Sequence, residues 1–210
     1  MKNKLLLFFK ILLFSLVLIS CSETNKLDNV NKILLFGDSL MSGYGLKEDQ
    51  TLSIVLENDL KQAGYNIKII NGSVSGDTSE DGLDRIEEYV FDNDIDLIVL
   101  GLGANDMLRR INPNQTESNL KKIIEIIKTK NIKIILAGMK ASPTNGLAYK
   151  KKFDDIFPKL AEEYDLALIP FLLKKVALNP KLNQSDGIHP NYEGAKVISE
   201  TIKESIINLE

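Results

Sequence analysis

Cysteine and histidine are almost absent from this chain of 210 residues, which has one of each, Cys21 and His189. A single cysteine excludes an intrachain disulfide. One cysteine and one histidine also exclude a zinc site built from these ligands. A metal site made only of carboxylates stays open, although the chain has no EF-hand loop. We therefore expect neither a metal nor a cofactor.

An excess of positive charge is also lacking. Lysine and arginine number 26 against 29 aspartate and glutamate residues, so the formal net charge is −3, and the isoelectric point is near 5.4. Nucleic-acid-binding domains usually carry a basic surface, so we expect no nucleic-acid partner. With 44% apolar residues at this length, the chain suits one domain with a substantial core.

The first twenty-one residues have no apolar run that is long and uninterrupted enough for a good membrane span. Lysines precede and interrupt an apolar stretch that ends in LVLISCS, as in a secretion signal. Residues 18–21 resemble the lipobox of bacterial lipoproteins. The resemblance implies cleavage before Cys21, acylation of its thiol, and a tether over residues 22–31 before a domain at 32–210.

Such a protein would be exported and held on a membrane, facing the periplasm or the cell exterior. An ordinary cleaved signal, which would leave a soluble or periplasmic protein, and an uncleaved anchor are the alternatives.

After this segment, apolar runs of strand length alternate with helical patterns five times. Such runs, bounded by turn residues, are typical of strands buried in a parallel sheet. The predicted strands are Lys32–Phe36, Ile67–Ile70, Asp96–Leu102, Ile132–Ala137 and Ala167–Ile169.

The segments between these strands have helical periodicity. Asn112 and Pro113 give a cap and a first-turn proline to a helix whose apolar residues share one face. The other predicted helices are Thr51–Ala63, residues 147–164 with an interruption around Pro158, and a final helix with Ala195, Ile198, Ile202 and Ile206 on one stripe. Repeated strand–helix units predict a three-layer α/β/α domain with a flavodoxin-like, five-stranded parallel sheet.

In such sheets the active groups lie just past the carboxyl ends of the strands. Gly37-Asp38-Ser39 follows the first predicted strand, and a sharp turn there would lift the hydroxyl of Ser39 to the sheet edge. Taken alone, the triplet is better explained by a plain turn or a helix cap.

Two more segments follow the second and third predicted strands. In residues 71–79, Gly76 can turn its backbone N–H toward a ligand because it has no Cβ, although a glycine-rich turn with a helix cap is the alternative. In residues 100–106, Asn105 offers a neutral amide donor that suits a short-lived anion. An Asx turn is the alternative there.

A fourth segment, SDGIHPNYEGA, precedes the final helix. It contains His189, so any chemistry between a serine and a histidine in this chain must use it. Asp186 stands three residues earlier, a spacing that can bring its carboxylate to Nδ1 of His189 and leave Nε2 facing outward. A lone histidine otherwise more often has a structural role.

Taken in order, FGDSLMSGYG, NGSVSGDTS, LGLGAND and DGIHPN resemble the SGNH, or GDSL, hydrolase superfamily. The likeness is strongest to its thioesterase I/lysophospholipase L1/arylesterase branch and extends from residue 32 to about residue 207. It implies that Ser39 is the nucleophile, His189 the general base and Asp186 its orienting partner. It also implies an oxyanion hole formed by the backbone N–H groups of Ser39 and Gly76 and the side-chain amide of Asn105.

The resemblance further implies a monomeric serine hydrolase that cleaves esters and thioesters of short- to medium-chain acyl groups through an acyl-enzyme. A carbohydrate O-acetylesterase is the alternative among enzymes. Outside enzymes, the alternatives are a flavodoxin-like binding module and a surface adaptor. Gly101-Leu102-Gly103 begins like a dinucleotide loop, but the third glycine of that motif is missing. Residues 138–149 are expected to border the acyl site or to form an ordinary surface loop.

Overall fold

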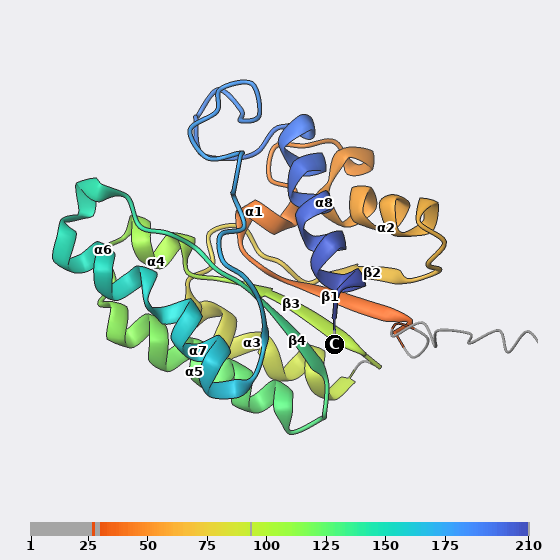
Figure 1. The fold of residues 1–210 in the computed structure, drawn as a ribbon, viewed down its shortest axis with the longest axis horizontal. Coiled ribbons are helices and arrows are strands. Elements are labelled where there is room, and N and C mark those ends of the chain that lie inside the picture. Colours follow the sequence, from red (N-terminus) through yellow and green to blue (C-terminus); the bar gives the residue numbers. More distant parts are fainter. Residues whose placement is uncertain (1–26, 28–29, 93, 210) are drawn as a thin grey trace, which may run out of the picture.

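The computed structural model describes residues 27, 30–92 and 94–209 (Figure 1). The predicted signal, the lipidation of Cys21 and most of the tether lie outside the described residues. None of the helices in the described ranges combines the length and the apolar character needed to cross a bilayer.

A five-stranded sheet forms the middle layer, as the sequence predicts. Its strands are β1 (Lys32–Gly37), β2 (Lys68–Asn71), β3 (Leu97–Gly101), β4 (Lys133–Ala137) and β5 (Ala167–Ile169). All neighbouring strands are parallel, in the order β2-β1-β3-β4-β5. The predicted bounds agree within one residue. Because β1 and β3 lie side by side in the centre, their carboxyl ends bring Gly37 opposite Gly101.

Helices cover both faces of the sheet (Figure 1). On one face lie α2 (Leu52–Gln62) and α8 (Tyr192–Ile207). On the other lie α3 (Ser79–Asp92), α5 (Pro113–Lys128), α6 (Leu147–Asp154) and α7 (Ile156–Tyr164). The short helices α1 (Ser39–Ser42) and α4 (Ala104–Leu108) follow β1 and β3 directly. Single 3₁₀ turns lie at Glu48–Gln50 and Pro143–Asn145.

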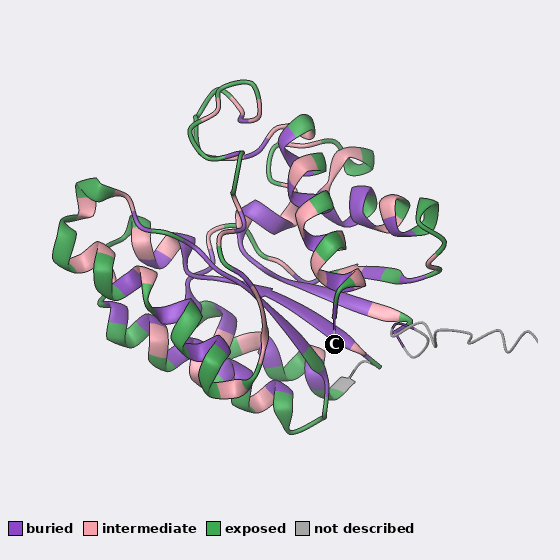
Figure 2. Cartoon of the chain, viewed as in Figure 1, coloured by how far each residue is buried: buried purple, intermediate pink, exposed green. Residues whose placement is uncertain are grey.

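The central strands are buried on both faces (Figure 2). Because side chains alternate along a strand, Ile33 and Leu35 pack with α2 and α8, whereas Leu34 and Phe36 pack with α3 and α5. All four are fully buried, and each such burial stabilises the fold by roughly 1.5–3 kcal/mol. The apolar β1 is therefore a rigid base for the polar turn that follows it.

One helix boundary differs from the sequence prediction. The segment 147–164 is interrupted at Asp155, between α6 and α7, and not at Pro158. Pro158 lies in the first turn of α7, where a backbone N–H would have no partner within that helix and its loss costs little. The proline is therefore compatible with a helix start and is not the break.

Candidate active site

Ser39 is the first residue of α1 and stands at the carboxyl end of β1. The Asp38 carboxylate caps this helix by accepting a 3.0 Å hydrogen bond from the backbone N–H of Leu40. The turn needs glycine at position 37, because a Cβ there would lie 2.6 Å from the carbonyl oxygen of Gly101. The strand therefore ends abruptly and leaves the Ser39 side chain half-buried at the sheet edge.

His189 lies in the loop before α8, where Asp186 fixes its ring. One carboxylate oxygen of Asp186 accepts the backbone N–H groups of Ile188 and His189, at 2.9 and 3.0 Å. The other lies 2.7 Å from Nδ1 of His189. These contacts, first that with the His189 backbone N–H, lower the pKa of Asp186 to about 2. An ionised carboxylate only accepts hydrogen bonds, so Nδ1 carries the ring proton.

Nε2 of His189 lies 3.0 Å from Oγ of Ser39, although the two residues are 150 positions apart. With the proton on Nδ1, Nε2 presents its lone pair to the serine hydroxyl. Asp186, His189 and Ser39 thus form one continuous hydrogen-bonded series. This arrangement can remove a proton from a hydroxyl and return it to a departing group.

Asn105 contacts the loop that carries Gly76. Asn105 lies in α4, and its side-chain Nδ2 donates to the carbonyl of Asp77 at 2.9 Å. Gly76 has a positive φ of 94°, which favours glycine, and its carbonyl accepts from Arg109 at 2.7 Å. Among the described residues, no acceptor is recorded for the backbone N–H of Ser39 or Gly76. Within the same described ranges, one of the two side-chain amide hydrogens of Asn105 also has no acceptor.

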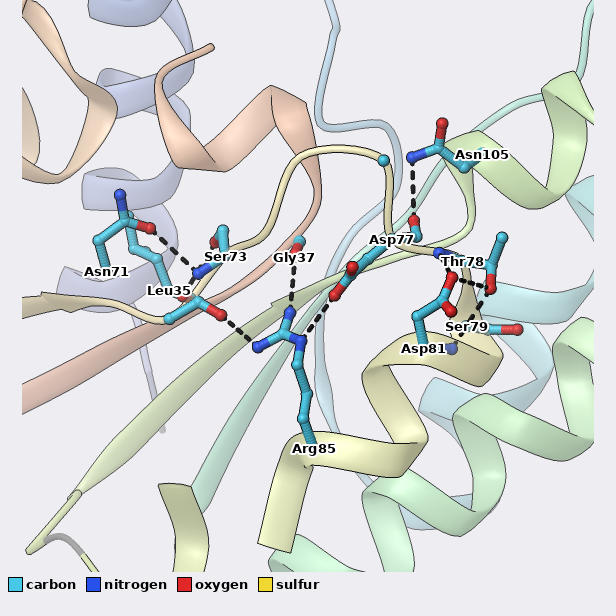
Figure 3. A network of polar contacts seen from close by, with 12 residues as sticks. Leu35, Gly37, Asn71, Ser73, Asp77, Thr78, Ser79, Asp81, Arg85 and Asn105 are labelled. Carbon is cyan, nitrogen blue, oxygen red and sulfur yellow. Dashed lines mark hydrogen bonds and ion pairs between the residues drawn. The ribbon is translucent and has the colours of Figure 1, made fainter. Parts of the chain in front are cut away.

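Arg85, on α3, ties the loop that carries Gly76 to the end of β1 (Figure 3). Its Nε donates to the carboxylate of Asp77 at 2.6 Å, and its Nη2 donates to the carbonyl of Gly37 at 3.1 Å. Its Nη1 donates to the carbonyl of Gly72. The guanidinium also lies 4.0 Å from the ring centroid of Phe36. The planar guanidinium of Arg85 therefore sets the spacing between the turn at residues 37–39, the serine turn, and the loop at residues 72–77, the glycine loop.

Asp106 holds α4 in place through its buried side chain. This carboxylate is fully buried and accepts the backbone N–H of Ser79 at 2.8 Å and its hydroxyl at 2.5 Å. It also accepts the hydroxyl of Thr116 at 3.0 Å. The bonds join α4 to α3 and α5, so α4 and its residue Asn105 are held by two neighbouring helices.

Asp38 lies in a very different environment from Asp186. It is fully buried, and one of its oxygens has no hydrogen-bond partner in the part of the chain that the structure describes. Burial raises its pKa to about 7 because a charged carboxylate loses its hydration there. The pKa of Asp38 is therefore raised, whereas the pKa of Asp186 is lowered.

The structure joins Ser39, His189 and Asp186 by direct contacts, and it places Asn105 against the loop that carries Gly76. The alternative for the second segment also holds, because Thr78 caps α3 through a reciprocal contact with Asp81. Sequence reasoning did not single out Arg85, Asp77 or Asp106. Arg85 follows the polar pattern of an ordinary amphipathic helix, so only the fold reveals what it contacts.

Residues 138–149 lie close to α4. Within this loop, Asn145 donates to the carbonyl of Met107 at 2.8 Å. On α4 itself, Leu108 is 53% exposed. The loop therefore borders the segment that carries Asn105.

A parallel α/β/α domain with this serine, asparagine and histidine geometry at one sheet edge defines the class of SGNH hydrolases. The sequence comparison agrees, because residues 35–197 match the model of the GDSL-like Lipase/Acylhydrolase family. The chain belongs to this family and is an enzyme of its esterase and thioesterase group.

Two curated relatives are similar over most of their length. The chain is 36% identical to the arylesterase of Vibrio mimicus over 195 residues, which cover 93% of this chain and 97% of the relative. It is 36% identical to thioesterase 1/protease 1/lysophospholipase L1 of Escherichia coli K12 over 168 residues, or 80% and 79% of the two chains.

A solved structure shows the same architecture. The esterase EstA from a Pseudoalteromonas species, inhibited by monoethylphosphonate, superimposes with a TM-score of 0.80 at 28% identity. The match covers 84% of this chain and 96% of EstA. The prediction of an SGNH hydrolase fold is thereby confirmed.

Proposed function

We propose that this enzyme hydrolyses carboxylic esters and thioesters of short- to medium-chain acyl groups, with Ser39 as the nucleophile. The observation that carries the proposal is the continuous series of contacts from Asp186 through His189 to Ser39, at 2.7 and 3.0 Å. A serine hydroxyl attacks slowly at neutral pH unless a base takes its proton, and this series supplies the base.

In the first half of the reaction, Oγ of Ser39 attacks the acyl carbonyl carbon while its proton passes to Nε2 of His189. The carbonyl π electrons move to the oxygen and give a tetrahedral oxyanion. As this intermediate collapses, the bond to the leaving oxygen or sulfur breaks, and His189 returns its proton to that atom. An alcohol or thiol leaves, and Ser39 carries the acyl group. Asp186 stabilises the imidazolium that forms between these two transfers.

The oxyanion requires donors that are in place before the charge develops. In the described part of the chain, the backbone N–H groups of Ser39 and Gly76 have no protein acceptor. They can therefore supply two of the donors. The second amide hydrogen of Asn105 can supply a third, since the first holds the Asp77 carbonyl. These donors are neutral, so they favour a charge that exists only in the transition state over a permanent anion.

In the second half, a water molecule takes the place of the leaving group. His189 removes a proton from the water as it attacks the acyl carbon, and the same donors hold the second oxyanion. Collapse releases the carboxylic acid and returns the proton to Ser39. All the groups come from one chain, so the proposed cycle needs no partner subunit and works in a monomer.

The acyl specificity is supported by the surroundings of the site and by the relatives. Large apolar side chains beside the site residues are exposed, namely Tyr44, Leu108 and Ile188, and can contact an acyl chain. The names of the two curated relatives specify aryl esters, thioesters and lysophospholipids. We extend these substrate classes to this enzyme as part of the proposal.

A substrate panel tests this specificity. The purified enzyme is given p-nitrophenyl esters and acyl-CoA thioesters of increasing acyl length up to palmitoyl, a lysophospholipid and an acetylated glycan, with Ser39→Ala as the blank. The proposal expects cleavage of the acyl esters and of at least one thioester. Cleavage of the acetylated glycan alone would instead establish a carbohydrate O-acetylesterase.

The lipobox resemblance at residues 18–21 supports a second part of the proposal, that the enzyme is exported and anchored through Cys21. Metabolic labelling with a fatty-acid analogue, compared between the natural chain and Cys21→Ala, tests it. Label that depends on Cys21 supports anchoring, whereas an unlabelled protein released into the soluble fraction contradicts it.

A further inference from the structure

The two residues of the proposed proton transfer stand on separate loops. Ser39 lies in the segment 38–51, between β1 and α2, and His189 lies in the loop 183–191 before α8. Neither loop is part of the sheet. A displacement of about 1 Å between reacting groups can lower a rate about 100-fold, so the fold must hold these two loops at a fixed spacing.

Gln184 contacts both loops. Its side-chain Nε2 donates to the carbonyl of Tyr44 at 2.7 Å and to that of Pro190 at 3.0 Å. Its backbone N–H donates to the carbonyl of His189 at 2.8 Å. One residue therefore holds the backbone on the C-terminal side of the imidazole and connects it to the serine-side loop.

Tyr44 completes the connection from the other side. Its ring packs against the imidazole of His189, with centroids 4.4 Å apart and planes at 40°. Its carbonyl is the acceptor for Gln184. A shift of the Tyr44 backbone would therefore move both the carbonyl that accepts from Gln184 and the ring that packs against the imidazole.

The contact between the loops is close. Gly45 has a φ of +72°, and a Cβ at that position would lie 2.3 Å from Oε1 of Gln184. The half-buried Gln184 side chain thus packs directly against bare backbone. Two described hydrogen bonds join residues 38–51 to residues 183–191, from the Ser39 hydroxyl to His189 and from Gln184 to the Tyr44 carbonyl.

The first of these bonds does not survive the proposed cycle. Once Oγ of Ser39 carries the acyl group it has no hydrogen to donate to Nε2. The Gln184–Tyr44 bond is then the hydrogen bond left between the two loops in this part of the structure. At this stage His189 must still be in place to activate water.

We propose that Gln184 is a positioning residue that, with Tyr44, holds the imidazole of His189 in the position needed to activate water during hydrolysis of the acyl-enzyme. The proposal rests on the function proposed above for Ser39 and His189. Gln184 touches neither reacting atom in this scheme and acts through the loops. Its loss should slow the release of the acyl group more than the attack of Ser39.

The test replaces Gln184 with Met, which keeps the length of the side chain and removes its two donors. Gln62→Met, at an exposed position of α2, is the matched control. With a p-nitrophenyl ester, the burst of p-nitrophenol reports acylation and the steady phase reports deacylation. We expect the deacylation rate of Gln184→Met to fall about 10- to 100-fold, the acylation rate to fall less, and the control to match the parent.

A second readout does not depend on activity. The chain has one histidine, so protein labelled with ¹⁵N-histidine gives a single imidazole pattern by NMR. We expect the Nδ1–H signal of His189 to shift or broaden in Gln184→Met and to stay unchanged in Gln62→Met. Should Gln184→Met fail to fold, Gln184→Glu is used, because it keeps the shape and places a carboxylate against the two carbonyls.

The proposal requires both effects in a variant that unfolds cooperatively like the parent. An unchanged imidazole signal overturns it even if activity falls, and so does a deacylation rate within twofold of the parent. A parent enzyme that releases no p-nitrophenol contradicts the proposed function instead, and the NMR comparison then decides the role of Gln184 alone.

Discussion

The carboxylate of Asp186 holds the backbone N–H of His189 at 3.0 Å with one oxygen and the imidazole Nδ1 of the same residue at 2.7 Å with the other. The turn that carries the base therefore also orients it. Because the pKa of Asp186 is lowered to about 2, chiefly by the bond from the His189 backbone, the carboxylate stays ionised throughout the neutral range. The ring then exposes Nε2 as a base toward Ser39.

Replacing Asp186 with Asn should therefore lower kcat by about 10⁴-fold. The amide of Asn can donate to Nδ1 and so stabilise the tautomer whose proton lies on Nε2, which cannot accept the serine proton. Steady-state hydrolysis of p-nitrophenyl butyrate measures the loss. The control is Asp49→Asn on the exposed turn Glu48–Gln50, which should match the parent. An Asp186→Asn enzyme with a tenth of normal turnover would exclude this role.

Asn105→Ala should lower kcat on the order of 10²- to 10³-fold, the usual effect of losing one oxyanion donor. Since the donor acts mainly on the transition state, KM should change little. The variant also loses the bond to the Asp77 carbonyl, so thermal unfolding is measured alongside the kinetics. Asn114→Ala, at an exposed position of α5, is the comparison. Equal kcat values for the two variants would exclude Asn105 as an oxyanion donor.

Arg85→Lys should lower kcat/KM about 10- to 100-fold. A lysine keeps the charge, but it cannot present the planar fork that reaches Asp77 and two backbone carbonyls. The glycine loop would then lose its fixed spacing from the serine turn. Kinetics and unfolding midpoints are compared for Arg85→Lys and Arg85→Met. An Arg85→Lys enzyme equal to the parent would show that charge alone suffices.

The buried Asp38 gives a pH dependence of stability whose sign follows from its raised pKa. The folded protein holds this proton up to about pH 7, whereas the unfolded chain releases it near the ordinary value of 3.8. The contribution of Asp38 to the free energy of unfolding therefore falls as the pH rises from about 4 to about 7. Asp186, with its lowered pKa, acts in the opposite sense, and its contribution is lost as the pH falls below about 4 toward 2.

Asp38→Asn separates these two effects. Asn still caps α1 but cannot ionise, so the variant should be more stable than the parent at pH 8, by on the order of 2–4 kcal/mol. Near pH 4 the two should converge. Urea unfolding from pH 4 to pH 8 provides the measurement. A constant difference between the two proteins over that range would contradict the buried, titrating carboxyl.

Strand positions and the segments of the site were predictable from the sequence because they depend on local patterns. Apolar runs such as Lys32–Gly37 are buried on both faces, and parallel strands place their carboxyl ends at one edge. That rule alone places Ser39 and Asn105 at the same edge of the sheet. The short spacing of Asp186 and His189 fixed their contact within one turn.

The contacts that set the spacing between the segments could not be predicted. Arg85 and Gln184 look like ordinary surface residues, and each acquires its partners only when distant backbone carbonyls converge on it. The cap at Thr78, two residues after Gly76, confirms the structural interpretation of that segment, and the oxyanion role of Gly76 stays a prediction. The predicted helix break around Pro158 differs from the observed break at Asp155, because a proline is tolerated in the first turn of a helix.

The central claim is that Ser39 is a nucleophile activated by His189, and labelling with a fluorophosphonate probe tests it most directly. The parent, Ser39→Ala and His189→Ala are treated in parallel, and the adduct is mapped by peptide mass spectrometry. The account predicts one adduct on Ser39 in the parent, none in Ser39→Ala, and strongly slowed labelling in His189→Ala. An adduct on another residue, or ester hydrolysis undiminished in Ser39→Ala, would contradict it.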